Sequence, residues 1–227
     1  FFIVFLGIAV LSGLATGVGY SISITIPVEW FPNRKGLITG LVAGGFGGGA
    51  ILESLISQQL FKLNLDILQV FLIVGLSKGV LLMLASFYIK RPESQRVSVD
   101  LIPISKLVKD PVFVRLFIGI FTGTFAGLLI IGNLKPIGLQ FPISVDTLVI
   151  GITVFSVANF SGRLFWGWLN DFVSGRILIP LSLFLIGVFT IIIGYVPLNG
   201  PLYLILSFVI GFSFGANFVV YAIETTQ

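Results

Sequence analysis

The sequence predicts an all-α integral membrane protein that contains seven transmembrane helices. Hydrophobic residues make up 56% of the chain and charged residues only 10%, whereas a soluble domain carries about 25% charged residues. Glycine also recurs at every fourth position from Gly36 to Gly48. Each such glycine would weaken a helix in water by about 1 kcal/mol relative to alanine. In a bilayer, however, a glycine stripe lets two helices approach closely, so both observations favour membrane-spanning helices.

Seven apolar segments are long enough to cross a hydrocarbon core, which takes about 20 helical residues. The longest connection, 90–111, contains Pro92, Pro103 and several charged residues, which is typical of a hydrated linker. We therefore expect residues 1–89 to end an N-terminal helix bundle and residues 112–227 to begin a C-terminal one. The predicted spans, in chain order, are 2–28, 36–60, 67–89, 112–134, 147–168, 177–196 and 202–223.

The placement of basic residues predicts the orientation. Only Lys62 and Lys135 lie in the second, fourth and sixth connections. The positive-inside rule then assigns the other three connections to the cytoplasm. We therefore expect the chain to lie in the plasma (cytoplasmic) membrane, with residue 1 on the outer side and residue 227 on the cytoplasmic side. The basic residues in or beside the cytoplasmic connections are Arg34, Lys35, Lys90, Arg91, Arg96, Lys106, Lys109, Arg115, Arg163 and Arg176.

Two features suggest that the chain belongs to a larger, internally repeated protein. It begins inside an apolar run without an initiator Met and stops just after another, so we expect further spans at both ends. Residues 13–20 resemble residues 211–218, because both contain G-x-x-x-G and an aromatic residue three positions later. Parallel repeats are typical of transporters built from two similar halves. A site between the halves would use Tyr20, Asn217 and Tyr221, although each could instead bond only a neighbouring helix.

Several chemistries are excluded by composition. Cysteine and histidine are absent, which excludes disulfides, thiolate chemistry and the usual zinc sites. The sequence also lacks the phosphate-binding loop Gly-x-x-x-x-Gly-Lys-Ser/Thr. We therefore expect no cofactor, no metal and no enzymatic activity. The net charge of +4 reflects the membrane orientation, and we expect a monomer that binds no nucleic acid.

Arg163 is the most informative charged residue within a span. It lies about 12 Å from Asp171 at 1.5 Å per residue. A buried guanidinium is costly unless it is paired, and its fork suits a carboxylate. Arg163 is therefore predicted to bind an anionic substrate, with Asn159 as a further polar candidate. Alternatively, Arg163 snorkels toward the cytoplasm or pairs with Asp171.

Glu53 and Lys78 are the other charged residues well inside predicted spans. Counted from the outer ends of their helices, they lie about 10 Å and 16 Å deep. One interpretation is a structural ion pair between the second and third spans. The other is ion coupling, because a buried carboxyl group can hold and release a proton during transport.

The end of the fifth span carries a loop motif. Gly167 is followed after three residues by Asp171, and three further residues precede Gly175-Arg176. This pattern resembles the loop signature of the major facilitator superfamily. It departs from that signature by one extra residue before Gly175 and by Phe172 in place of a basic residue. The resemblance implies a cytoplasmic gate locked by charge pairs, with Arg34 as a further gate residue.

Four motifs in the same order resemble the oxalate/formate antiporter family within that superfamily. The resemblance implies a major-facilitator-type helical bundle in which this chain supplies about the fourth to tenth of twelve helices. It also implies a small carboxylate substrate in a cavity lined mainly by the first, fourth, seventh and tenth helices. The motifs are Gly13-x-x-x-Gly17-x-Gly19-Tyr20, Trp30-Phe31-Pro32-x-Arg34-Lys35-Gly36, Lys135-Pro136-Ile137-Gly138 and Asn159-x-x-Gly162-Arg163.

We therefore expect a secondary active transporter, either an antiporter or a symporter, that works by alternating access in the lipid bilayer. Its expected substrates are small organic anions such as oxalate, formate or other mono- and dicarboxylates. Two alternatives stay open. Seven spans with the start outside and the end inside also fit a seven-helix receptor, and a major-facilitator transporter of a different substrate class would share the motifs.

Overall fold

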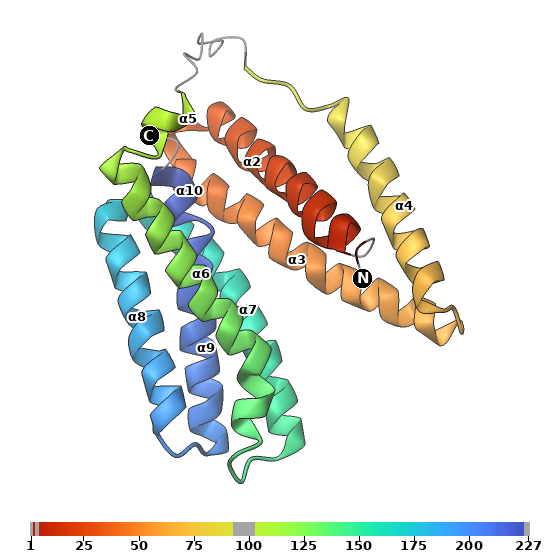
Figure 1. Cartoon of the computed structure of the whole chain (residues 1–227), viewed down its shortest axis with the longest axis vertical. Helices are drawn as coiled ribbons and strands as arrows, with labels where there is room; N and C mark the ends of the chain where they lie inside the picture. Colours follow the sequence, from red (N-terminus) through yellow and green to blue (C-terminus); the bar gives the residue numbers. More distant parts are fainter. Residues whose placement is uncertain (1, 3–4, 93–102, 225–227) are drawn as a thin grey trace. The chain divides into compact units, whose positions relative to one another are not determined.

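The computed structural model describes residues 2, 5–92 and 103–224, and within these ranges the chain is helical with no β-strand (Figure 1). This confirms the all-α fold class. Most of the predicted linker, residues 93–102, lies outside the described ranges. The elements in chain order are η1 (Phe5–Leu11), α2 (Ser12–Trp30), η2 (Pro32–Arg34), α3 (Lys35–Lys62), α4 (Ile67–Ser86), α5 (Ile104–Leu107), α6 (Pro111–Gly138), α7 (Val145–Asn170), α8 (Gly175–Tyr195), α9 (Gly200–Asn217) and α10 (Val220–Glu224).

The long helices correspond to the predicted spans. Six helical stretches in the described part have the length and apolar composition needed to cross a membrane. The second predicted span corresponds to the 28-residue α3, which is long enough, at about 42 Å for 1.5 Å per residue, but is not among these six. The six stretches are Phe5–Trp30, Ile67–Ser86, Pro111–Gly138, Val145–Asn170, Gly175–Tyr195 and Gly200–Glu224.

Two predicted spans are not continuous α-helices. The first begins with the π-helical element η1 before α2 starts at Ser12. The last is interrupted between α9 and α10, where the Val219 N–H donates to the Ala216 carbonyl at 3.1 Å. This bond reaches back three residues instead of four and therefore tightens the turn that ends α9.

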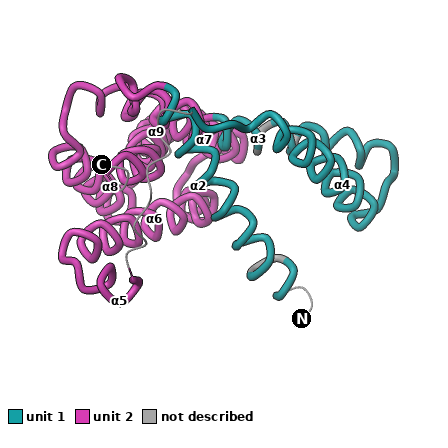
Figure 2. The backbone as a smooth tube through the Cα atoms, turned by 90° about the horizontal axis from the view of Figure 1, so that it is seen from above, with its two compact units in different colours: residues 1–30, 45–96 teal, residues 31–44, 97–227 magenta. Residues whose placement is uncertain are grey.

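The chain divides into two compact units, coloured separately in Figure 2. One contains residues 1–30 and 45–96, and the other contains residues 31–44 and 97–227. The sequence predicts a boundary between two helix bundles in the linker 90–111. The boundary between the two compact units, between residues 96 and 97, lies inside that linker. Residues 31–44, expected with the N-terminal bundle, are grouped with the C-terminal helices. The cause is close packing of the start of α3 against α7.

The first unit holds α2, the later part of α3 and α4. A capping box begins α4, because the Asp66 side chain accepts from the Gln69 N–H while the Gln69 side chain accepts from the Asp66 N–H. The end of α2 is tied to the segment after α4 by a 2.9 Å bond from Trp30 Nε1 to the Lys90 carbonyl. The capping box satisfies backbone N–H groups at the start of α4, which have no partners within the helix.

The second unit is built on four long helices that run side by side, α6, α7, α8 and α9 (Figure 1). Asp110, Ser144, Ser174 and Asn199 cap their N-termini through side-chain oxygens, as such residues do in helices generally. Apolar side chains fill the centre, including the fully buried Tyr203, whose hydroxyl donates to the Leu134 carbonyl at 3.2 Å. The core of this unit is therefore well defined.

Glycines bring α7 and α9 into close contact. A Cβ atom added at Gly211 would lie 2.5 Å from the Phe155 carbonyl oxygen, and one at Gly215 would lie 2.7 Å from the Asn159 carbonyl oxygen. The second copy of the predicted G-x-x-x-G repeat is therefore a packing surface. The first copy differs, because Gly13 and Gly17 have no described atom within 4 Å of such a Cβ position.

Candidate functional site

The Arg163 side chain lies inside the second unit and is only 5% exposed. Its Nε donates to Asn159 Oδ1 at 3.0 Å, one helical turn earlier on α7. Its Nη1 donates to the Ala43 carbonyl of α3 at 2.6 Å. The guanidinium carbon lies 4.4 Å from the centre of the Phe218 ring, at the turn between α9 and α10. Arg163 thus contacts α3 and the turn between α9 and α10 as well as its own helix, where Asn159 accepts the hydrogen bond from its Nε.

The predicted glycine stripe makes the contact between α3 and α7. A Cβ atom at Gly36 would overlap the Gly167 carbonyl oxygen, and one at Gly40 would lie 2.7 Å from the Arg163 carbonyl oxygen. Conversely, a Cβ atom at Gly167 would lie 2.5 Å from the Gly36 carbonyl oxygen. At Gly44 the nearest α7 atoms are side-chain atoms, the closest at 3.2 Å. The close helix approach expected for the stripe is therefore confirmed at Gly36, Gly40 and Gly44.

Asp171 caps the N-terminus of α3. Its two carboxylate oxygens accept from the backbone N–H groups of Gly36 at 2.7 Å and Leu37 at 3.0 Å. The first turn of α3 has no acidic residue of its own, so Asp171 supplies the negative charge that favours a helix N-terminus. Arg163 reaches Ala43 about two turns further along α3. Two polar contacts therefore flank the glycine contact between α3 and α7.

The remaining predicted gate residues lie near the start of α8 or on the surface. Ser174 caps α8, accepting from the Arg176 N–H at 3.3 Å. The Glu224 carboxylate of α10 lies directly over Gly175, where an added Cβ atom would overlap it. The side chains of Arg176 and Arg34 are exposed. Glu224 was not predicted from the sequence, although an acidic residue directly after the last predicted span was a visible signal.

Asn217 and Tyr221 face α6. The amide of Asn217, at the end of α9, lies against Gly123, and the hydroxyl of Tyr221, in α10, lies against Gly119, one turn earlier on α6. Asn217 is fully buried, and neither its side-chain atoms nor the Tyr221 hydroxyl has a hydrogen-bond partner in the described part of the chain. The α6 glycines were not predicted as a contact surface. Their spacing, with Gly127 next in the series, was the available signal.

Tyr20 lies in the first unit. Its half-buried ring packs edge-on against Phe46 at 5.9 Å between ring centres. Tyr20 and the four candidates around α7 and α9 therefore belong to different units.

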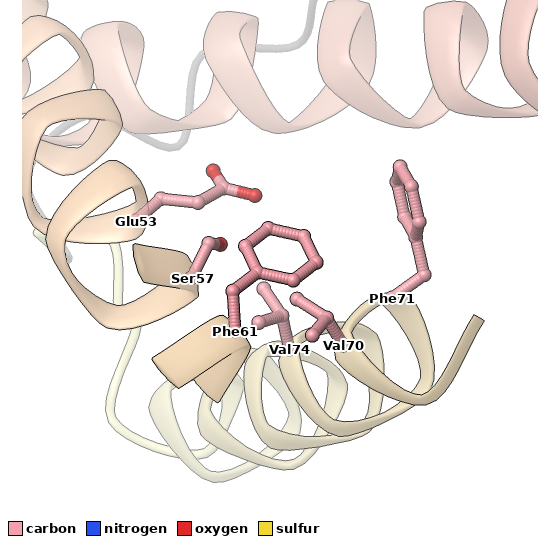
Figure 3. Close-up of a pocket in the computed structure, with 6 residues that line it drawn as sticks. All are labelled: Glu53, Ser57, Phe61, Val70, Phe71 and Val74. Atoms are coloured by element: carbon pink, nitrogen blue, oxygen red, sulfur yellow. The ribbon is translucent and has the colours of Figure 1, made fainter. Parts of the chain in front are cut away.

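Glu53 and Lys78 also lie in the first unit, where Lys78 Nζ forms an ion pair with Glu53 Oε2. Figure 3 shows Glu53 and Ser57 of α3 lining a pocket of about 180 Å³. The opposite wall comes from α4, and the lining is otherwise apolar. The other lining residues are Phe61, Val70, Phe71 and Val74.

Comparison with known proteins shows the family. Residues 1–225 match the Major Facilitator Superfamily. An oxalate:formate antiporter of Oxalobacter formigenes is 28% identical over 167 residues, covering 71% of this chain and 40% of that protein. The uncharacterized MFS-type transporter YhjX of Escherichia coli K12 is 28% identical over 225 residues, covering 95% of this chain and 55% of that protein.

A shorter match covers 20% of this chain and 8% of the apicoplast pyruvate carrier 1 of Toxoplasma gondii, with 38% identity over 45 residues. The chain spans about half the length of the first two relatives. The family match, together with helices long and apolar enough to cross a membrane, identifies a multi-pass integral membrane protein. The chain belongs to the major facilitator superfamily of transporters.

Proposed function

We propose that this protein is a secondary active transporter, either an antiporter or a symporter, of small organic anions such as oxalate, formate or other mono- and dicarboxylates. The observation that carries the proposal is the Arg163 guanidinium, buried in a membrane-spanning helix. Family membership favours transport over a seven-helix receptor. The chemistry of Arg163 favours an anionic substrate over other substrate classes.

Arg163 suits a carboxylate for two physical reasons. Its planar fork can donate two parallel hydrogen bonds to the two oxygens of one carboxylate. Two of the groups that accept from it here, the Asn159 amide and the Ala43 carbonyl, are neutral. A carboxylate in place of the Ala43 carbonyl would carry a full negative charge and therefore form a stronger bond with the guanidinium. The names of two relatives, an oxalate:formate antiporter and a pyruvate carrier, also support a carboxylate.

The other polar candidates take supporting roles in this proposal. Asn159 orients Arg163 through its Nε. Asn217 and Tyr221, whose polar atoms point toward α6, are proposed as substrate contacts. Tyr20 on α2 is proposed as a further substrate contact. The Glu53–Lys78 pair is proposed as the ion-coupling element. A carboxylate that releases its lysine partner and takes up a proton would couple transport to proton movement.

Alternating access would use the gate between α3 and α7. The Asp171 carboxylate on the first N–H groups of α3 supports this gate. Gly167 permits the contact, and Gly175, Arg176 and Arg34 flank it. We place this end in the cytoplasm, with residue 1 outside and residue 227 inside the plasma membrane, because the basic residues of the connections gather there.

Counterflow in proteoliposomes tests the substrate class. Vesicles loaded with unlabelled oxalate, formate, lactate or pyruvate should accumulate the same labelled anion from outside. Arg163→Gln should nearly abolish accumulation, whereas Arg115→Gln should not, because it removes the same charge from an exposed position on α6. Counterflow of a cationic or neutral solute with no anion counterflow would contradict the proposed substrate class.

A further inference from the structure

The same N–H group of Arg163 that suits a substrate anion holds α3 against α7 in this structure. Nη1 donates to the Ala43 carbonyl at 2.6 Å, and Ala43 is fully buried. Because the Arg163 side chain is only 5% exposed, an anion can reach the guanidinium only if a neighbouring element moves. The neighbours on its α3 side and its α9–α10 side are Ala43 and Phe218.

We propose that a bound carboxylate and the Ala43 carbonyl compete for Arg163, so that anion binding loosens α3 from α7. The proposal rests on the proposed function of Arg163 and adds the coupling between binding and helix separation. Replacing the Ala43 carbonyl by a carboxylate strengthens the bond to Arg163, because a carboxylate is a stronger acceptor of a guanidinium N–H than a neutral carbonyl. No covalent step is involved.

The arrangement of the contact makes α3 the element that responds. Asn159 lies on the same helix as Arg163, so their bond is kept when α7 moves as a unit. The Ala43 bond joins two helices and is therefore the one that helix separation breaks. At the other end of the contact, Asp171 still holds the first N–H groups of α3. Anion binding would thus release the Arg163 end first and leave the Asp171 contact in place.

Disulfide trapping tests the proposal, since the chain has no native cysteine. The pair Gly44→Cys and Leu164→Cys suits trapping, because the two positions face each other across the helix contact: a Cβ atom at Gly44 would lie 3.2 Å from Leu164 Cδ2 and 3.8 Å from Leu164 Cγ. The purified protein carrying both cysteines is oxidised with and without oxalate or formate, and the rate of disulfide formation is measured. The same pair is then tested with Arg163→Gln, with Arg163→Lys and with the control Arg115→Gln.

We expect three results. Arg163→Gln should slow disulfide formation by roughly fivefold or more, because losing a charge-assisted bond shifts an equilibrium by about ten- to a hundredfold. Arg163→Lys should restore part of the rate, and Arg115→Gln should leave it unchanged. A saturating anion should slow the reaction when Arg163 is present and should have no effect in Arg163→Gln.

The outcomes separate this inference from the proposed function. Anion binding without any change in the disulfide rate would overturn the competition and leave the transport proposal intact. An unchanged rate in Arg163→Gln would overturn the tie between α3 and α7 whatever the anion does. If Arg163→Gln slows the reaction but no anion binds, the tie stands, while the proposed substrate class and the competition both fail.

Discussion

Gly40→Ala is the sharpest test of the contact between α3 and α7. The new Cβ atom would lie 2.7 Å from the Arg163 carbonyl oxygen and 3.4 Å from the Cα atoms of Leu164 and Gly167. Since these are backbone atoms, no side chain can rotate away. A normal carbon–oxygen contact is about 3.3–3.6 Å, so α3 must retreat by roughly 0.6 Å or more. The same displacement would lengthen the Arg163–Ala43 bond.

The expected cost follows from two opposing terms. Overpacking of a close contact costs about 1–3 kcal/mol, while alanine favours a helix over glycine by about 1 kcal/mol. The net destabilisation should be about 0–2 kcal/mol, which lowers an apparent Tm by up to about 8 °C in a protein of this size. The assay is thermal unfolding of the purified protein followed by gel filtration.

Gly187→Ala on α8 is the matched control, because no described atom lies within 4 Å of its Cβ position. This variant should keep or raise the apparent Tm, since it gains helix propensity at no packing cost. The reasoning is refuted if Gly40→Ala unfolds at the same temperature as Gly187→Ala, or at a higher one.

Three further predictions concern the gate, the orientation and the ion pair. Asp171→Asn removes the negative charge at the N-terminus of α3, an interaction worth about 0.3–2 kcal/mol. If Asp171 acts only in the gate, the turnover rate should change while anion affinity stays constant. A large loss of anion affinity would contradict a gate role. Lys106→Cys and Gln140→Cys, both exposed, test orientation with an impermeant thiol reagent on intact cells: only Gln140→Cys should react, and labelling of Lys106→Cys would reverse the topology. Glu53→Gln should remove the pH dependence of transport if Glu53 couples ions; a stability loss with unchanged pH dependence, matched by Lys78→Gln, would indicate a structural ion pair.

Much of the fold could be predicted from local composition. Helix length and apolar content are properties of the sequence itself, so the positions of the spans follow from it directly. The glycine stripe on α3 also predicted a close helix contact, because glycine is costly in helices that have no need of it. The partner helix could not be predicted, since the stripe carries no information about which surface fills it.

The sequence indicated which residues belong to the candidate site, but not which groups these residues contact. Arg163 and Asp171 were both identified, and one alternative paired them with each other. In the structure Asp171 binds the backbone of α3 at Gly36 and Leu37, and Arg163 binds the Ala43 carbonyl. Backbone groups are present at every residue, so no sequence pattern marks Ala43 as an acceptor. The break after Asn217 was likewise hidden inside a continuous apolar run.

Equilibrium binding of labelled oxalate and formate to Arg163 variants tests the central claim most directly, because binding is measured apart from flux. If Arg163 holds the substrate carboxylate, Arg163→Gln should weaken affinity by roughly ten- to a hundredfold, the value of a charge-assisted bond. Arg163→Lys should lie between Arg163→Gln and the unmodified protein, because it keeps the charge but loses the fork. Arg115→Gln should bind like the unmodified protein. Unaltered anion affinity in Arg163→Gln would remove Arg163 from the binding site and contradict the account.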